Sequence, residues 1–145
     1  MSIIERFKDD RGALSLEAMI LFPALILVLL LVVAFGRVGS ANNAVDTAAR
    51  NAARAASLER SGGSASSAGQ QVAASVLNQQ GLQCTSTSVS VFTGGFSAQI
   101  GEPASTTATV TCVVRLSDIG LPGLPGSKTL TSSFTSSIDS YRQRG

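Results

Sequence analysis

The chain has 145 residues, with 11 basic and 9 acidic side chains for a net charge of +2, no histidine and two cysteines. The lack of histidine excludes imidazole catalysis and histidine-containing zinc sites, and two cysteines cannot form a four-thiolate metal site. The small net charge and the absence of a polybasic block argue against nucleic acid as a partner, so we expect neither an enzyme nor a protein that carries a cofactor.

The first predicted element is an apolar run at residues 18–36, in which 17 of 19 residues are hydrophobic. As a helix, such a run spans roughly 28 Å at ~1.5 Å per residue, which matches the hydrocarbon core of a bilayer. It has no ionisable group and is apolar on all sides, and the rest of the chain is too small to bury it. The run therefore predicts a membrane-inserted helix, with membrane lipid as a partner.

Three kinds of membrane segment are compatible with this run. It is a secretory signal peptide cut after Gly39-Ser40-Ala41, a plain single-pass anchor, or the N-terminal helix of a prepilin. The run is longer than a usual signal-peptide core of about 7–15 residues, which disfavours the first interpretation. The count of basic residues gives no orientation, because three precede the run and three follow it within twenty residues: Arg6, Lys8, Arg11, Arg37, Arg50 and Arg54.

The residues directly before the run favour the prepilin interpretation. Gly12 and Ala13 end a charged stretch, and Glu17 lies four residues after Ala13. Gly12 permits the extended backbone that a protease requires and interrupts helix continuity, and cleavage after it would place a charged amine one helical turn from Glu17. A carboxylate in the membrane costs ~2.5–3.5 kcal/mol at mid-bilayer unless it finds such a partner.

This arrangement resembles the type IV prepilin pattern. In that family a membrane aspartyl peptidase cuts after a glycine, and a glutamate at the fifth mature position pairs with the N-terminal amine of a neighbouring subunit. The resemblance implies a leader at residues 1–12, cleavage between Gly12 and Ala13, and an assembly role for Glu17.

After the membrane, the sequence predicts that the helix continues to residue 58, so that one helix covers residues 13–58. Small apolar residues recur at a spacing of three and four, and Asp46 lies four residues before Arg50, where the two can pair. Residues 59–69 have the Gly- and Ser-rich composition of a flexible linker, and residues 67–80 are compatible with a second, short amphipathic helix.

The C-terminal part, residues 70–145, is expected to be a small extracytoplasmic domain. Alternation of Thr, Ser and Val predicts strands at residues 82–92, 104–116 and 129–139, with a loop at residues 120–126. The fold class is therefore α+β, with a long membrane-spanning and amphipathic helix, a short helix and a small antiparallel sheet of about three strands.

Two cysteines, Cys84 and Cys112, fall in the first and second predicted strands. If paired residues in this hairpin sum to 196, the turn is centred near Ala98 and the two cysteines face one another. We expect a disulfide bond, which would stabilise the domain by roughly 3–4 kcal/mol. Because disulfides form in oxidising compartments, the bond places this domain outside the cytoplasm and residues 1–12 inside.

Residues 11–56 resemble the TadE-like pseudopilins of tight adherence (Tad/Flp) pilus systems. The matching features are Gly12 in an Arg-Gly cleavage region, Glu17, Pro23 within the apolar helix, and Arg54 in a basic, small-residue continuation. Pro23 removes one helical hydrogen bond and is expected to kink the membrane helix.

The resemblance implies a minor pilin, since major pilins of these systems usually have little globular domain. Its expected partners are prepilin peptidase, other pilin or pseudopilin subunits and the pilus assembly platform. The expected location is the cell membrane, crossed once, with possible incorporation into the pilus. A secreted or single-pass anchored extracytoplasmic binding domain without a pilus role is the alternative.

Overall fold

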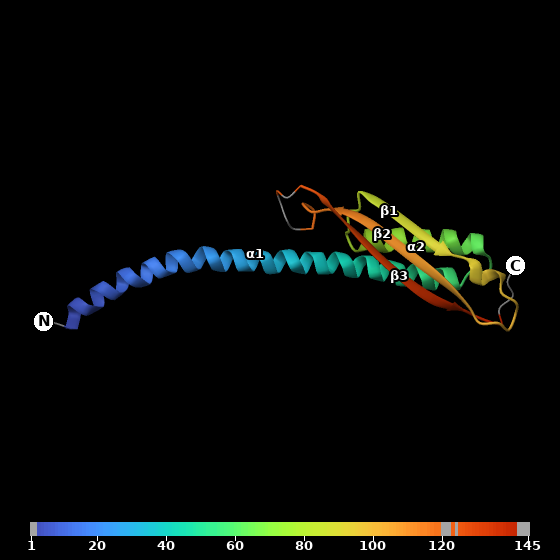
Figure 1. Ribbon diagram of the computed structural model, residues 1–145, viewed down its shortest axis with the longest axis horizontal. Helices are drawn as coiled ribbons and strands as arrows, with labels where there is room; N and C mark the ends of the chain where they lie inside the picture. Colours follow the sequence, from blue (N-terminus) through green and yellow to red (C-terminus); the bar gives the residue numbers. More distant parts are fainter. Residues whose placement is uncertain (1–2, 120–122, 124, 142–145) are drawn as a thin grey trace. The chain divides into compact units, whose positions relative to one another are not determined.

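The computed structural model describes the backbone of residues 3–119, 123 and 125–141, and the side chains from Glu17 onward within these ranges. In chain order the described elements are α1 (Ile3–Ser57), α2 (Gly62–Gln79), β1 (Ser86–Phe92), the short 3-10 helix η1 (Gly94–Ser97), β2 (Ala104–Arg115) and β3 (Ser127–Ile138) (Figure 1). The chain divides into two compact units, one ending at Gly36 and one beginning at Arg37. The predicted α+β class is confirmed.

Helix α1 begins at Ile3 rather than at residue 13, so the expected interruption at Gly12 is absent from the backbone. A single glycine inside a helix costs only about 0.5–1 kcal/mol relative to alanine, which the flanking helix formers can offset. At its other end α1 stops at Ser57, one residue before the predicted end. Pro23 lies inside this helix.

The sheet has the strand order β1-β2-β3, and both pairs of neighbours are antiparallel. Side chains of β2 alternate between its two faces, and those on the inner face are fully buried: Thr106, Ala108, Val110, Cys112 and Val114. On the outer face, hydroxyl groups of β2 and β3 pair at 2.8 Å (Thr107 with Thr135) and 2.6 Å (Thr109 with Ser133). The Thr- and Ser-rich alternation of the sequence thus separates a polar face from a packed one.

The core of the second unit combines the sheet with the C-terminal part of α1. Alanines dominate that part of the helix, and five of them have no exposed surface: Ala48, Ala49, Ala52, Ala53 and Ala56. Small side chains allow the helix backbone to approach its neighbours closely, and Ala52, Leu77 and Val110 belong to one buried cluster. The compact unit therefore begins at Arg37 and not at residue 70 as predicted.

The predicted linker at residues 59–69 is wrong, because α2 already begins at Gly62. Ser61 caps this helix with a capping box. Its hydroxyl accepts a hydrogen bond from the Ser64 backbone N–H, and the Ser64 hydroxyl accepts one from the Ser61 backbone N–H. The small residues here serve close packing rather than flexibility. A Cβ atom at Gly69 would lie 2.7 Å from Val91 Cγ2 and 3.5 Å from the Ala52 carbonyl oxygen.

One polar cluster connects α1 with β3. Asp46 accepts hydrogen bonds from Arg50 Nε at 2.8 Å and from the Ser132 hydroxyl at 3.0 Å, so the predicted Asp46–Arg50 pair is present. The hydrogen bond from Arg50 has the larger effect, and together with the bond from Ser132 it holds the pKa of Asp46 below its ordinary value. The Arg50 guanidinium also lies over the Phe134 ring, 5.1 Å from its centre.

Candidate functional site

The apolar run presents its large side chains outward along α1. Phe22, Leu27 and Leu30 are 66%, 68% and 59% exposed, and no large hydrophobic residue of the run is buried within the described part of its unit. A contiguous apolar surface of this kind is unfavourable in water and favourable in hydrocarbon. Among the described residues, α1 is the one helix that is long and apolar enough to cross a membrane. The run is therefore a candidate single membrane span.

Glu17 lies at the N-terminal border of this run, on the same helix as Gly12 and Ala13. The backbone from residue 12 to residue 17 is helical, so positions 13 and 17 are one turn apart on one side of the helix. The side chain of Ala13 lies outside the part of the chain whose side chains the structure describes. Glu17 is exposed, and the side chains described in the structure offer it no cation within ion-pair distance.

The disulfide bond between Cys84 and Cys112 is present, with Cα atoms 5.5 Å apart. Its expected register is wrong, however. Cys84 precedes β1, which begins at Ser86, and Cys112 pairs with Thr87 across the ladder. The residue numbers of each β1–β2 pair add up to 199 rather than to 196. This register places Val89 and Val91 against the core, and burial of these two side chains favours it.

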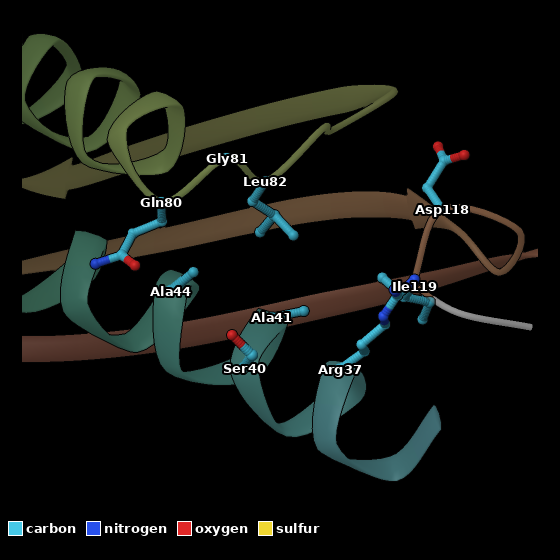
Figure 2. A pocket seen from close by; sticks show the side chains of 9 residues that line it. All are labelled: Arg37, Ser40, Ala41, Ala44, Gln80, Gly81, Leu82, Asp118 and Ile119. Carbon is cyan, nitrogen blue, oxygen red and sulfur yellow. The ribbon is translucent and has the colours of Figure 1, made fainter. Parts of the chain in front are cut away.

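A second feature is a shallow, open pocket of about 220 Å³ in the unit that begins at Arg37. Its walls come from α1, from the turn after α2 and from the segment after β2 (Figure 2). Arg37 extends toward Ile119, and the Asp118 carboxylate lies beyond Ile119 (Figure 2). No sequence motif predicts this pocket, because its charged residues, Arg37 and Asp118, belong to separate elements.

The residues of the described ranges contain no group of three His, Cys, Asp or Glu side chains arranged to hold a metal ion. The predicted loop at residues 120–126 lies partly outside the described residues. Of it, Gly123 and Gly126 adopt positive φ angles of 90° and 126°, which glycine accommodates without strain.

The fold and these features define a small α+β protein with one candidate N-terminal membrane span and a disulfide-bonded domain. The family of TadE-like proteins matches residues 12–54 of the chain. The predicted resemblance to this family is therefore confirmed over these residues, which begin at Gly12 and end at Arg54. No curated protein and no solved structure matches the chain significantly.

Proposed function

We propose that the chain is a minor pilin, or pseudopilin, that takes part in assembling a Tad/Flp pilus after cleavage by prepilin peptidase. The observation that carries the proposal is the family match over residues 12–54, since it begins at the expected cleavage glycine and includes Glu17 and Pro23. The unit from Arg37 onward is large for a shaft subunit of these systems, which favours a minor component. The chain itself performs no catalysis in this proposal.

The proposed sequence of events starts with insertion of the apolar run, with residues 1–12 in the cytoplasm. The Cys84–Cys112 disulfide supports this orientation, because its formation requires an oxidising compartment for the domain. Prepilin peptidase then hydrolyses the Gly12–Ala13 bond, and the new Ala13 amine is protonated. The mature chain passes to the assembly platform, where it meets other pilin or pseudopilin subunits.

The part of α1 that we expect to pack against neighbouring subunits is the apolar run at residues 18–36, whose large side chains are exposed within their unit. Beyond Gly36, the alanine face of the helix is buried within the domain, with Ala48, Ala52 and Ala56 fully covered. Small residues that would otherwise suit packing between helices of different subunits are thus used inside this chain. Subunit contacts are expected from the apolar run, with Glu17 accepting from the N-terminal amine of a neighbour.

The test is substitution of Glu17 in a host with an active Tad system. Glu17→Ala should still be processed, while its incorporation into pili or pseudopili should fall about tenfold, as expected for the loss of about 1.4 kcal/mol. Glu102→Ala, which removes an exposed carboxylate from the domain, is the matched control and should leave incorporation unchanged. Quantitative immunoblots of sheared pilus and membrane fractions measure both steps.

Equal incorporation of Glu17→Ala and Glu102→Ala would remove the assembly role of Glu17. A processed, disulfide-bonded chain that never enters a pilus fraction would instead favour a single-pass anchored extracytoplasmic domain with no pilus role.

A further inference from the structure

Strand β3 is an edge of the sheet and lacks the features that usually protect an edge. The strand order β1-β2-β3 leaves β3 with one neighbour, and Figure 1 shows β2 between β3 and β1. A long edge strand can pair with another chain unless charges, prolines or bulges prevent it. β3 pairs with β2 along its 12 residues without a bulge, and it contains no proline and no charged side chain from Thr129 to Ile138. This edge is therefore open to a further strand.

The β2–β3 ladder shows which backbone groups of β3 face the open edge. In an antiparallel pair, opposed residues that exchange backbone hydrogen bonds alternate with opposed residues that do not. The Leu116 N–H donates to the opposed Gly126 carbonyl at 3.1 Å, so even-numbered residues of β3 bond to β2 and odd-numbered residues direct their N–H and C=O groups outward. The outward-directed residues all carry hydroxyl groups: Thr129, Thr131, Ser133, Thr135 and Ser137.

The hydroxyl pairs on the outer face of the sheet agree with this assignment. Side chains lie closest in pairs that do not exchange backbone hydrogen bonds, where the Cα atoms are about 4.5 Å apart. Thr131, Ser133 and Thr135 each place a hydroxyl 2.6–3.2 Å from the hydroxyl of the opposed β2 residue. Their backbone groups therefore face away from β2.

The charges at the two ends of β3 favour antiparallel pairing between two copies of the chain. Lys128 is exposed near the start of β3, and Asp139 is exposed directly after its end. Asp139 accepts a hydrogen bond from the Tyr141 backbone N–H, and a carboxylate has further acceptor sites. When two β3 strands run antiparallel, Lys128 of each copy lies at the end where the other copy has Asp139. A parallel arrangement would place like charges together, which is unfavourable.

We propose that two copies of this chain pair through their β3 edges in antiparallel orientation, so that their sheets become one continuous sheet. The two-fold axis passes beside Ser133, which opposes Ser133 of the second copy. In this register Thr131 opposes Thr135, and the outward N–H groups donate to outward carbonyl groups of the other copy. The pairing uses only the unit that begins at Arg37 and needs no pilus, so its failure would leave the proposed function untouched.

Cysteine cross-linking of the full-length chain tests this pairing. Ser133→Cys is expressed in a host without a Tad system, and its isolated membranes are oxidised with copper phenanthroline. Opposed, hydrogen-bonded residues have Cα atoms about 5.5 Å apart, a distance that a disulfide spans. Ser90→Cys is the matched control, because Ser90 is an exposed serine in the same row of the sheet, on the opposite edge.

On non-reducing gels, Ser133→Cys should give about fivefold more cross-linked dimer than Ser90→Cys, since only its thiols lie within disulfide distance. Equal yields would overturn the proposal. Cross-links from Ser133→Cys to a different protein alone would also overturn it, because the edge would then have another occupant.

Charge at the two-fold axis gives a second test without a new thiol. Ser133→Lys should weaken the dimer about fivefold, because like charges directly opposite one another on paired strands are destabilising. Ser90→Lys should leave the dimer unchanged, and a mixture of Ser133→Lys with Ser133→Asp should restore it. Native mass spectrometry of the full-length chain in mild detergent measures the dimer fraction.

Ser133 is exposed, so these variants should fold, and an intact Cys84–Cys112 bond checks that they do. Dimer formation by Ser133→Lys as strong as that of the wild type would overturn the proposal. Failure of the mixture with Ser133→Asp to recover the dimer would do the same, since a merely structural defect at Ser133 would not be rescued by the opposite charge.

Discussion

The two halves of α1 place their apolar side chains in opposite ways. Between Glu17 and Gly36 the helix carries large residues that point outward, as Leu27 does with 68% of its surface exposed. After Arg37 it carries small residues that are buried, as Ala52 is with no exposed surface. The first half requires a hydrocarbon solvent around it, whereas the second supplies its own apolar surroundings from α2 and the sheet.

This difference explains why the overall hydrophobic content of 44% is a poor guide to the core of the protein. Seventeen of these hydrophobic residues belong to the apolar run at 18–36, whose large side chains are exposed within their unit. The domain depends on alanines, which bury little area each, so close approach and a covalent bond matter more to it than large apolar side chains. The following experiments test this contrast.

The largest expected effect comes from removing the disulfide. Cys84→Ala/Cys112→Ala opens a loop with a sequence separation of 28 residues and should destabilise the domain by about 3–4 kcal/mol on the loop-entropy account. Hydrogen exchange of the full chain in a bilayer should then show lost protection in β1, β2 and β3, with the apolar run unchanged. Equal loss of protection in both regions would contradict the division into two units.

Replacing an exposed leucine by arginine should have a large effect where the leucine faces hydrocarbon and a small one where it faces water. Leu27→Arg should disfavour insertion by about 3 kcal/mol, because a charged side chain is placed near the middle of the membrane helix. Leu58→Arg is the matched control, since Leu58 is 60% exposed on the domain and faces water. The membrane fraction resistant to alkaline extraction should fall for the first variant alone. An equal fall in both variants would contradict the inference that Leu27 faces hydrocarbon.

Enlarging an alanine should produce a smaller effect, again in one half only. Ala52→Leu overfills the contact between α1 and α2 and should cost about 1–3 kcal/mol of domain stability. Ala24→Leu makes the same change at an exposed position of the apolar run and should be nearly neutral. Thermal unfolding in mild detergent, followed by circular dichroism, measures both. A neutral Ala52→Leu would mean that the alanine face is loosely packed.

The sequence predicts the structure where one physical signal dominates. Nineteen residues without a charge predict a membrane helix, and strict alternation predicts the three strands of the sheet. The disulfide between Cys84 and Cys112 is predicted from a hairpin of the first two strands, and the bond is present although the register of that hairpin differs from the expected one. The family resemblance rests on Gly12, Glu17, Pro23 and Arg54, and all four residues lie within the matched range 12–54.

The features that the sequence does not predict correctly have separate physical causes. Gly62 to Gly69 have the composition of a linker, yet Gly69 is small because Val91 leaves no room for a Cβ atom. The β1–β2 register depends on which residues contact the helices, which alternation alone does not specify. The Arg37 pocket is assembled from three separate elements and has no local pattern.

The central claim is that a prepilin peptidase converts this chain into a pilin-like subunit. The most direct test is the intact mass of the membrane-extracted protein from a host with active prepilin peptidase. The account predicts the loss of residues 1–12, so that the mature chain begins at Ala13, with the disulfide retained. A full-length product would contradict it, and so would a chain that has lost residues 1–41, which would identify the apolar run as a signal peptide.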